Sequence, residues 1–268
     1  MSSYDPDSLP AEDGEVNRLA HRARLGRRGF IRRMKELGLA KGMRVLDLGC
    51  GEGTLTTRLA SYVHPAPVVG FDRSERLLTR AREFAAKLDY PALRFVSGEA
   101  ESLPFPEDSF DFVYVRLVLQ HLPDPALVLR GIYRVLAPGG ILVVEDIDHE
   151  MVFVHPVPPS WEPLRARWCE GQRRCGGDPT IGRKLAGLLR ESPFGGGVVK
   201  LQPAHGHGPA ITEYARELGP SLLDYLTDPE DRRAGEAMFD QLAHPETARQ
   251  TDLYLIQFIA RAVKPGKD

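Results

Sequence analysis

The 268-residue chain has only three cysteines, and its charges nearly cancel. A small, odd number of cysteines in a long chain does not build a disulfide framework, which argues against a disulfide-stabilised secreted domain. Thirty-five Lys and Arg residues against 37 Asp and Glu residues give a net charge of −2. This balance excludes a chain-wide basic surface of the kind that grips nucleic acid.

Long apolar stretches are also absent. No run approaches the roughly 18 unbroken apolar residues of a membrane span. The chain begins MSSYDPDSLPAEDGE, which is acidic and polar where a secretory signal needs an apolar centre. The composition of 42% hydrophobic and 27% charged residues suits a large core with a solvated surface. We therefore expect a soluble, cytoplasmic globular protein with no membrane partner.

Residues 1–40 have a character of their own and are predicted to form an N-terminal helical cap. Apolar residues recur there at helical spacing, with Gly26 and Gly29 as a weak point. Eight Lys and Arg residues stand between Arg18 and Lys35 with no acid among them. Such charge runs are usually solvated helix faces, so an RNA partner is disfavoured.

Residues 41–149 alternate between short apolar runs and amphipathic stretches. Five short apolar runs, predicted to be buried strands, lie at 44–46, 68–71, 93–96, 112–115 and 141–144. Between them are stretches whose apolar residues recur at helical spacing. Alternating strands and helices imply crossover connections and a parallel sheet covered on both faces. The fold class is therefore predicted to be a doubly wound α/β sheet.

The rhythm changes in residues 150–268. A proline-rich connector, HPVPPSWEP, precedes a helical stretch to about Arg174, and a turn and a further helix follow. A strand is expected in VVKLQ, two helices over 211–246 broken at Asp228-Pro229, and a last strand in TDLYLIQFIARAV. We expect this part to complete the sheet and to form a helical lid over a substrate pocket, from about 150–176 and 205–250.

A glycine-rich loop, VLDLGCGEG at Val45–Gly53, ends the first strand and opens a helix. Its spacing is G-x-G-x-G and differs from the dinucleotide pattern G-x-G-x-x-G. Glycine lets the backbone pass close to a ligand or adopt a positive φ. Asp72 ends the second strand, where a carboxylate can accept hydrogen bonds from ribose hydroxyls.

Two further motifs, GEAESLPF from Gly98 and FDFVYVRLVLQHLPDP with RVLAPGGILVVED, follow in order. Together the motifs resemble the class I S-adenosylmethionine-dependent methyltransferases, in the small-molecule group of natural-product and quinone type. The resemblance covers about residues 43–147 densely and 177–183 more loosely. It implies a seven-stranded, mostly parallel, Rossmann-like methyltransferase fold with helical lid insertions.

The resemblance also implies S-adenosyl-L-methionine as the cofactor and assigns residues to it. Asp47 and the loop would hold the methionine half, Asp72 the ribose, and the residues after the second and third strands the adenine. Arg116 would face either the cofactor carboxylate or the substrate. The N-terminal helix would add Tyr4, Arg18 and Arg22 as contacts of the methionine carboxylate. The implied cofactor-binding residues are Tyr4, Arg22, Asp47, Gly49, Cys50, Gly51, Gly53, Asp72, Arg73, Glu99, Ala100, Val115 and Arg116.

Methyl transfer from a sulfonium needs chiefly a well-placed acceptor, and a general base is optional. His149, just after the fifth strand, is the candidate base, with Asp148 or Asp146 to orient it. His205 and His207 are the next candidates, since they follow a later strand. These acids and histidines lack a tight ligand spacing, so no metal site is expected.

The predicted function is transfer of a methyl group to a small-molecule acceptor, most simply O-methylation of a hydroxyl in secondary metabolism. An apolar or aromatic acceptor suits Phe153, Trp161, Trp168 and Tyr214, although these side chains equally suit a helix-packing core. The alternatives are a non-methylating reaction such as a cyclisation, a binding protein, or RNA methylation. The last is disfavoured because the fourth strand lacks an Asn-Pro-Pro-Tyr element. An oligomer is compatible with the sequence.

Overall fold

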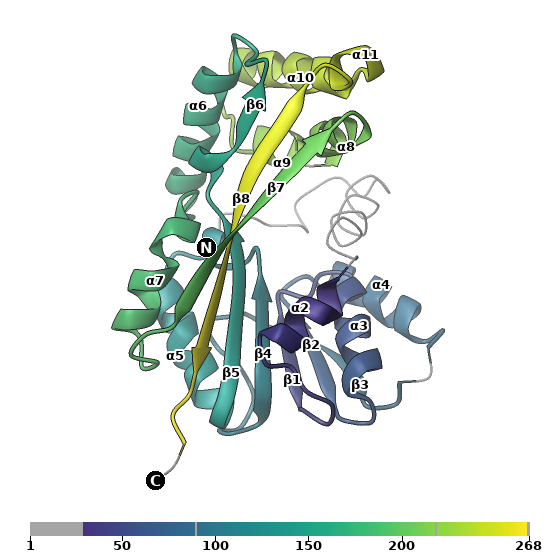
Figure 1. Cartoon of the computed structure of the whole chain (residues 1–268), viewed down its shortest axis with the longest axis vertical. Coiled ribbons are helices and arrows are strands. Elements are labelled where there is room, and N and C mark those ends of the chain that lie inside the picture. Colours follow the sequence, from purple (N-terminus) through teal and green to yellow (C-terminus); the bar gives the residue numbers. More distant parts are fainter. Residues whose placement is uncertain (1–28, 89, 218, 267–268) are drawn as a thin grey trace.

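The computed structural model describes residues 29–88, 90–217 and 219–266, and a single mixed β-sheet forms its centre (Figure 1). The strand order is β3-β2-β1-β4-β5-β8-β6, and β7 pairs with β8. Strands β1 to β5 are parallel, which confirms the predicted doubly wound, mostly parallel α/β fold. The strands are Val45–Leu48 (β1), Val68–Asp72 (β2), Leu93–Ser97 (β3), Phe110–Arg116 (β4), Leu136–Ile147 (β5), Phe153–His155 (β6), Val198–His207 (β7) and Asp252–Val263 (β8).

Helices connect and cover these strands. Among the described α-helices, α4, α5 and α10 are capped by a side chain, as where the Ser74 hydroxyl accepts a hydrogen bond from Leu77 N at 3.2 Å at the start of α4. The α-helices are Phe30–Glu36 (α2), Thr54–Val63 (α3), Glu75–Ala85 (α4), Pro125–Val135 (α5), Trp161–Arg174 (α6), Ile181–Glu191 (α7), Pro209–Glu217 (α8), Gly219–Leu223 (α9), Pro229–Ala243 (α10) and Pro245–Ala248 (α11). Short 3-10 turns occupy Leu119–His121 (η1) and His149–Met151 (η2).

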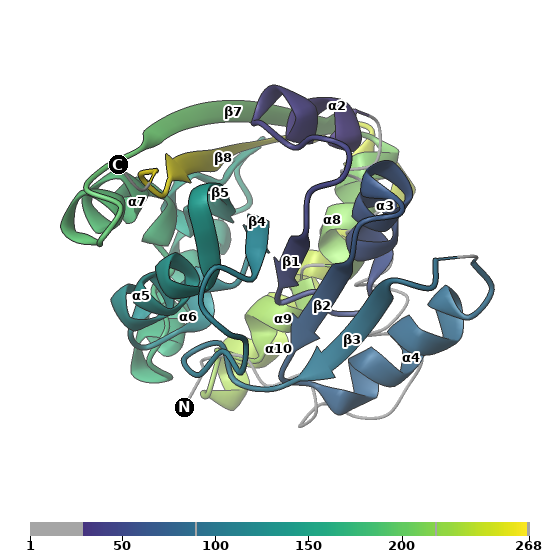
Figure 2. The same cartoon turned by 90° about the horizontal axis from the view of Figure 1, so that it is seen from below.

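The two faces of the sheet carry separate hydrophobic clusters, with α3 and α5 on opposite sides (Figure 2). Strand β4 shows how the sequence makes this possible. Phe112 and Tyr114 join the cluster of α2 and α3, whereas Val113 and Val115 join the cluster of α5 and α7. Neighbouring residues on a strand point to opposite faces, so a continuous apolar run fills both layers.

Parallel pairing brings the carboxyl ends of the strands to one edge. Leu48 of β1 pairs with both Phe71 of β2 and Val115 of β4. The residues that follow them, including Asp72 and Arg116, therefore emerge together. This edge is where ligands bind in open α/β sheets.

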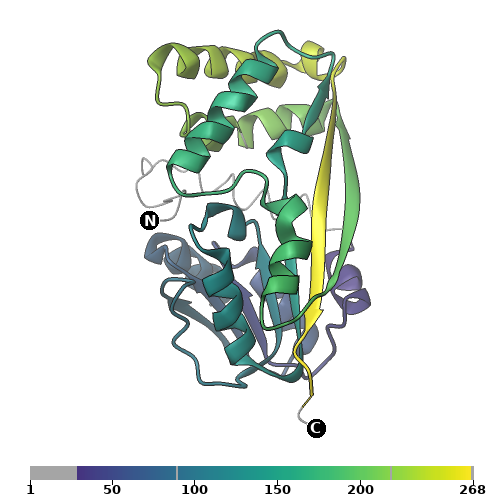
Figure 3. The same ribbon diagram turned by 90° about the vertical axis from the view of Figure 1, so that its left-hand side faces the viewer.

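Strand β8 carries the chain beyond this edge. It pairs with β5 over Ile141–Ile147 and then with β6, and its ladder with β7 continues to the pair His207 and Asp252 (Figure 3). Helices α6 and α8 to α11 gather around this extension, and we call them, with β6, the cap. This cap is a different part of the chain from the N-terminal helical cap predicted for residues 1–40. The cap has its own hydrophobic cluster around Trp161 and Trp168, whose rings meet edge to face at 5.6 Å.

Two details differ from the prediction. The sheet has eight strands where seven were expected, because Phe153–His155 pairs with β8 as β6. The periodicity before Asp228 also contains two helices, α8 and α9, where one was predicted. The break at Asp228-Pro229 is confirmed, since Asp228 caps α10 through Glu230 N and Asp231 N.

Gly171 in α6 provides a test of the cap packing. A Cβ atom there would lie 2.0 Å from the carbonyl oxygen of Tyr225, so Gly171→Ala is expected to destabilise the protein by about 1–3 kcal/mol. Gly187 in α7 is the matched control, because a Cβ there meets nothing within 4 Å. Gly187→Ala is expected to stabilise by about 0.5–1 kcal/mol through helix propensity. Urea unfolding of both variants measures the difference, and equal effects would contradict the close approach of α6 to Tyr225.

Candidate functional site

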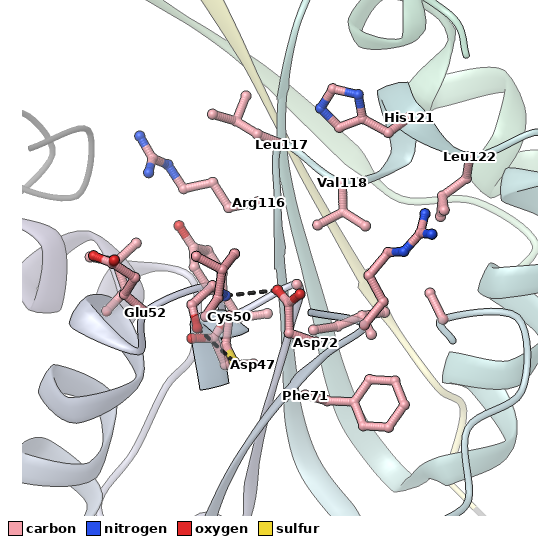
Figure 4. Close-up of a pocket in the computed structure, with 18 of the residues that line it drawn as sticks. Asp47, Cys50, Glu52, Phe71, Asp72, Arg116, Leu117, Val118, His121 and Leu122 are labelled. Atoms are coloured by element: carbon pink, nitrogen blue, oxygen red, sulfur yellow. Dashed lines mark hydrogen bonds between the residues drawn. The ribbon is translucent and has the colours of Figure 1, made fainter. Parts of the chain in front are cut away.

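A cavity opens at the carboxyl edge of the parallel strands (Figure 4). The ends of β1, β2 and β4 and the loop after β3 form its walls. The lining residues are Asp47–Glu52, Thr54, Leu55, Phe71–Arg73, Leu77, Gly98–Ala100, Tyr114, Arg116–Val118 and Gln120–Leu122. Most of the residues predicted to bind a cofactor therefore surround one cavity.

The glycine loop forms the floor of the cavity, between β1 and α3. Gly49 has φ +74, and a Cβ atom there would lie 2.1 Å from a methyl carbon of Val118. Gly51 has φ +53, and a Cβ atom there would meet nothing within 4 Å among the described atoms. The first glycine thus serves close packing, whereas the second leaves open space on the cavity side.

Asp72 ties this loop to the end of β2. Its Oδ2 accepts a hydrogen bond from Gly51 N at 2.8 Å, and its Oδ1 accepts one from Ser74 N at 3.0 Å. A carboxylate oxygen can accept more than one hydrogen bond, so these two contacts are compatible with a ligand bound in the cavity. The carboxylate is held in a fixed orientation at the predicted ribose position.

Asp47 lies deeper, at the end of β1, with 3% of its surface exposed. The Thr56 hydroxyl donates a hydrogen bond of 2.6 Å to its Oδ2. Burial raises the pKa of Asp47 to about 7, and the Thr56 hydrogen bond opposes this shift. Asp47 is thus a buried carboxyl group poised between its two protonation states near neutral pH.

Arg73, Glu99 and Ala100 line the side of the cavity predicted to hold the adenine. Arg73 Nε lies 4.0 Å from Glu99 Oε1, and the Glu99 side chain is 62% exposed. Exposed pairs of this kind contribute little to stability.

Arg116 stands at the end of β4 and is linked to a buried carboxylate. Its Nε lies 3.7 Å from Glu145 Oε2, and Arg33 of α2 binds the same carboxylate at 2.9 and 3.1 Å. The Tyr114 hydroxyl donates to Glu145 Oε2 at 3.0 Å. Two guanidinium groups therefore share one buried carboxylate, so this cluster carries excess positive charge, and Arg116 presents it to the cavity. This charge suits an anionic ligand group.

Two predicted cofactor residues lie outside the cavity wall. Val115 is fully buried in the cluster with α5 and α7, because its neighbours on β4 take the opposite face. Gly53 begins α3, and a Cβ atom there would lie 2.7 Å from the Phe95 ring. Both positions support packing around the site. Cys50 does line the cavity, and burial raises the pKa of its thiol well above the usual range.

Tyr4, Arg18 and Arg22, predicted to close over the cofactor, lie outside the described residues. Their roles therefore stay predictions.

His149, the predicted base, is buried in η2 beside the cavity and is not part of its wall. Its Nε2 lies 3.0 Å from the side-chain oxygen of Gln120, which does line the cavity. Asp148, expected to orient the imidazole, binds Arg183 instead, with 2.9 Å between its Oδ1 and Arg183 Nη2. Asp148 also caps η2, because its Oδ1 accepts a hydrogen bond from Glu150 N at 3.0 Å, so its carboxylate is engaged by Arg183 and by this turn.

The other histidine candidates lie away from the cavity. His205 and His207 are both about half exposed on β7 and contact Asp252 Oδ1 at 2.8 and 3.2 Å. They are on the part of the β7–β8 ladder that runs into the cap. Neither of these candidate bases therefore lines the cavity.

The aromatic side chains suggested for the acceptor have other places. Trp161, Trp168 and Tyr214 are buried in the cap core, and Phe153 is 53% exposed on β6. The helix-packing interpretation is the correct one for the first three.

Gln120 and Leu122 line the cavity but were not predicted to do so. Both belong to VLQHLPDP after β4, so their position at a strand end was the available signal. The nearby Leu117 has φ +56, and its N–H donates to Glu145 O at 2.8 Å. A positive φ in a non-glycine residue is strained backbone of the kind that gathers at functional sites.

Asp146 lies behind this turn. It is buried, and burial raises its pKa to about 7 although backbone N–H groups donate to it.

Among the described residues, no group of three His, Cys, Asp or Glu side chains is arranged to hold a metal ion. No helix within the described ranges has the length and apolar character to cross a membrane.

Comparison with known proteins gives consistent matches. A family model described as a methyltransferase domain matches residues 39–191. The demethylmenaquinone methyltransferase of Listeria monocytogenes is 37% identical over 130 residues, which are 48% of this chain and 52% of that protein. The chain thus spans about half the length of the curated relatives it matches.

Two solved structures share the fold. A Bacillus subtilis protein superposes with a TM-score of 0.60 at 19% identity, covering 90% of this chain and 99% of that one. A 4+2 cyclase superposes with a TM-score of 0.56 at 21% identity, covering 96% of this chain and 86% of that one. At these identities the likeness concerns architecture alone.

Proposed function

Because the chain belongs to the family of S-adenosylmethionine-dependent methyltransferase domains, we propose that it transfers a methyl group from this cofactor to a small-molecule acceptor in the cavity described above. The proposed acceptor is apolar or aromatic and carries a hydroxyl group, and the proposed setting is secondary metabolism. The resemblance to a demethylmenaquinone methyltransferase supports a quinone-like ring as one acceptor class.

The open side of Gly51 is the observation that carries this proposal. A Cβ atom there would meet nothing within 4 Å among the described atoms, Gly51 lines the cavity, and its N–H donates to the carboxylate of Asp72. A loop built this way admits a ligand against its backbone and offers paired oxygens to vicinal hydroxyls. The loop also lacks the longer glycine spacing that places a pyrophosphate at a helix N-terminus. S-adenosylmethionine contains no pyrophosphate, so it does not need that spacing.

We assign the parts of the cofactor to the residues that line the cavity. Asp72 would accept hydrogen bonds from the ribose, and Glu99 with Ala100 would meet the adenine. Asp47 and Arg116 would hold the methionine half, with the excess positive charge near Arg116 favouring its carboxylate. These contacts match charge with charge and donor with acceptor.

When bound, the cofactor supplies an electrophilic methyl group on a sulfonium. The chain's own contribution is to place the acceptor oxygen in line with that methyl group and to exclude water. Leu117, Val118 and Leu122 give the acceptor side of the cavity an apolar surface. The Tyr225 hydroxyl from the cap lies 3.3 Å from His121 Nδ1, so the cap reaches the cavity at this point.

A screen of acceptors by mass spectrometry tests the proposed function. The protein is incubated with S-adenosylmethionine and a set of phenols, hydroxyquinones and aliphatic alcohols, and products are read for the gain of one methyl group. We expect such a gain, accompanied by S-adenosylhomocysteine. A product of unchanged mass, formed only when the cofactor is present, would instead support a cyclisation or other rearrangement.

The cap is proposed to act as a lid over the acceptor. Hydrogen exchange in residues 205–217 and 219–250 is expected to slow when S-adenosylhomocysteine and an acceptor are both bound, because the cap then closes on the ligand. The exchange is measured by mass spectrometry with and without ligands, and α5, which does not line the cavity, serves as the internal control. Full protection of this segment without ligands would make it a fixed structural layer.

A further inference from the structure

Gln120 in η1 is held by hydrogen bonds from several other segments of the chain. Its backbone N–H donates to Asp146 Oδ2 at 3.3 Å. Its carbonyl oxygen accepts from Gln172 Nε2 at 3.0 Å and from Asp178 N at 2.8 Å. Its side-chain Oε1 meets His149 Nε2 at 3.0 Å. Three segments, from β5, η2 and the α6–α7 region, thus fix one residue.

The remaining polar atom of Gln120 is its side-chain nitrogen. Within the described part of the chain, Nε2 has no hydrogen-bond partner. It is also not among the fully buried side-chain atoms that lack a partner, so this nitrogen is not fully buried. Gln120 is 4% exposed and belongs to the cavity wall. The two N–H groups of Nε2 are therefore available on the cavity side, in a side chain whose position is already fixed.

The partner of the amide oxygen determines what His149 does. An amide oxygen only accepts, so His149 Nε2 must carry the proton in this contact. A nitrogen that already donates to Gln120 does not take a proton from an acceptor. His149 is thus placed to orient the amide of Gln120, in the manner of residues that fix a ligand-binding side chain from behind.

We propose that Gln120 is a specificity-determining residue whose Nε2 donates a hydrogen bond to a carbonyl or anionic oxygen of the methyl acceptor, and that His149 is the positioning residue for this amide. The inference rests on the proposed function, because it assumes that the acceptor occupies the Gln120 side of the cavity. It extends that function by naming the chemical class of acceptor that the cavity selects.

The surroundings favour this acceptor class. A fixed donor in an apolar wall stabilises an oxygen that carries negative charge more than it would in water. Leu117, Val118 and Leu122 supply the apolar wall beside Gln120. A flat ring with an ionisable hydroxyl next to a carbonyl satisfies both features. A plain aromatic alcohol satisfies only the apolar one.

The test compares two probes of the same ring system by calorimetry on the full chain saturated with S-adenosylhomocysteine. The first probe, 2-hydroxy-1,4-naphthoquinone, has an ionisable hydroxyl beside a carbonyl. The second, 2-naphthol, has a hydroxyl and no carbonyl. The wild-type protein is expected to bind the first more tightly by about tenfold or more, the value of a hydrogen bond to a charged oxygen.

Variants then locate the preference. Gln120→Met keeps the length of the side chain without a donor and should abolish the preference, and Gln120→Glu should weaken the naphthoquinone further by charge repulsion. His149→Phe should reduce the preference, and His149→Gln should restore it, because a glutamine amide can again donate to Gln120. A merely structural role for His149 would not distinguish these last two variants. His205→Phe, on the exposed part of β7, is the matched control and should keep the wild-type preference.

Several results would overturn the inference. It fails if wild type shows no preference, if it binds neither probe, or if Gln120→Met keeps the preference. A preference for 2-naphthol would mean that the amide presents its oxygen to the cavity. Loss of S-adenosylhomocysteine binding in Gln120→Met would assign Gln120 to the cofactor. Failure of the proposed function itself is separate, because it would appear as absence of S-adenosylhomocysteine binding in the wild type.

Discussion

The Gly51→Val variant is expected to bind S-adenosylhomocysteine at least about a hundredfold more weakly than the wild type, or not at all. The added Cβ and its two methyl groups would fill open space at Gly51, a residue that lines the cavity and donates its N–H to Asp72. Nothing in the described protein lies within 4 Å of that Cβ, so the Cβ itself meets no clash within the fold. The loss would come from exclusion of the ligand and from the unfavourable φ.

The φ contribution is separable from the steric one. Gly51 has φ +53, where a branched residue is strained by about 1–3 kcal/mol. Gly42, in the turn before β1, has φ +82, is exposed, has equally open surroundings and does not line the cavity. Gly42→Val should therefore lose similar stability in urea unfolding and keep its affinity in calorimetry. Normal binding by a folded Gly51→Val variant would place the cofactor elsewhere.

The Asp72→Ala variant is expected to lose about tenfold to a hundredfold in affinity for S-adenosylhomocysteine. The substitution removes the proposed ribose acceptor, and it also releases Gly51 N and Ser74 N from the carboxylate. Both effects weaken binding. Asp72→Asn, which keeps one oxygen acceptor of the same shape, should fall between the alanine variant and the wild type.

An analogue of S-adenosylhomocysteine without the ribose hydroxyls separates these two effects. If Asp72 binds the ribose, the analogue binds the wild type weakly, and Asp72→Ala lowers its affinity by no more than the loop contribution. Calorimetry with both ligands on both proteins completes the cycle. Equal losses for the two ligands would show that Asp72 only organises the glycine loop.

Local patterns in the sequence were sufficient for the sheet and the floor of the cavity. Buried strands such as Val45–Leu48 are apolar on both faces, and such runs between helical stretches have few structural alternatives. The ends of parallel strands then meet at one edge by topology alone, so Asp72 could be placed there from its position at the end of the second strand, whereas Asp47 and Arg116 were assigned through the family resemblance. Contacts that depend on strand order can be predicted from the sequence, because consecutive strands joined by short connections are usually neighbours in the sheet.

The tertiary structure alone decided which candidates reach the cavity. The sequence could not show that Trp161 and Trp168 pack with each other, that Asp148 binds Arg183, or that His149 meets Gln120. These pairs join residues brought together by long-range packing, and a histidine or tryptophan carries the same sequence signal in a core as in a pocket. The amino-acid sequence therefore determined the fold and the cofactor edge through local periodicity. The acceptor side depends on how the cap packs on β8, and that packing exists only in three dimensions.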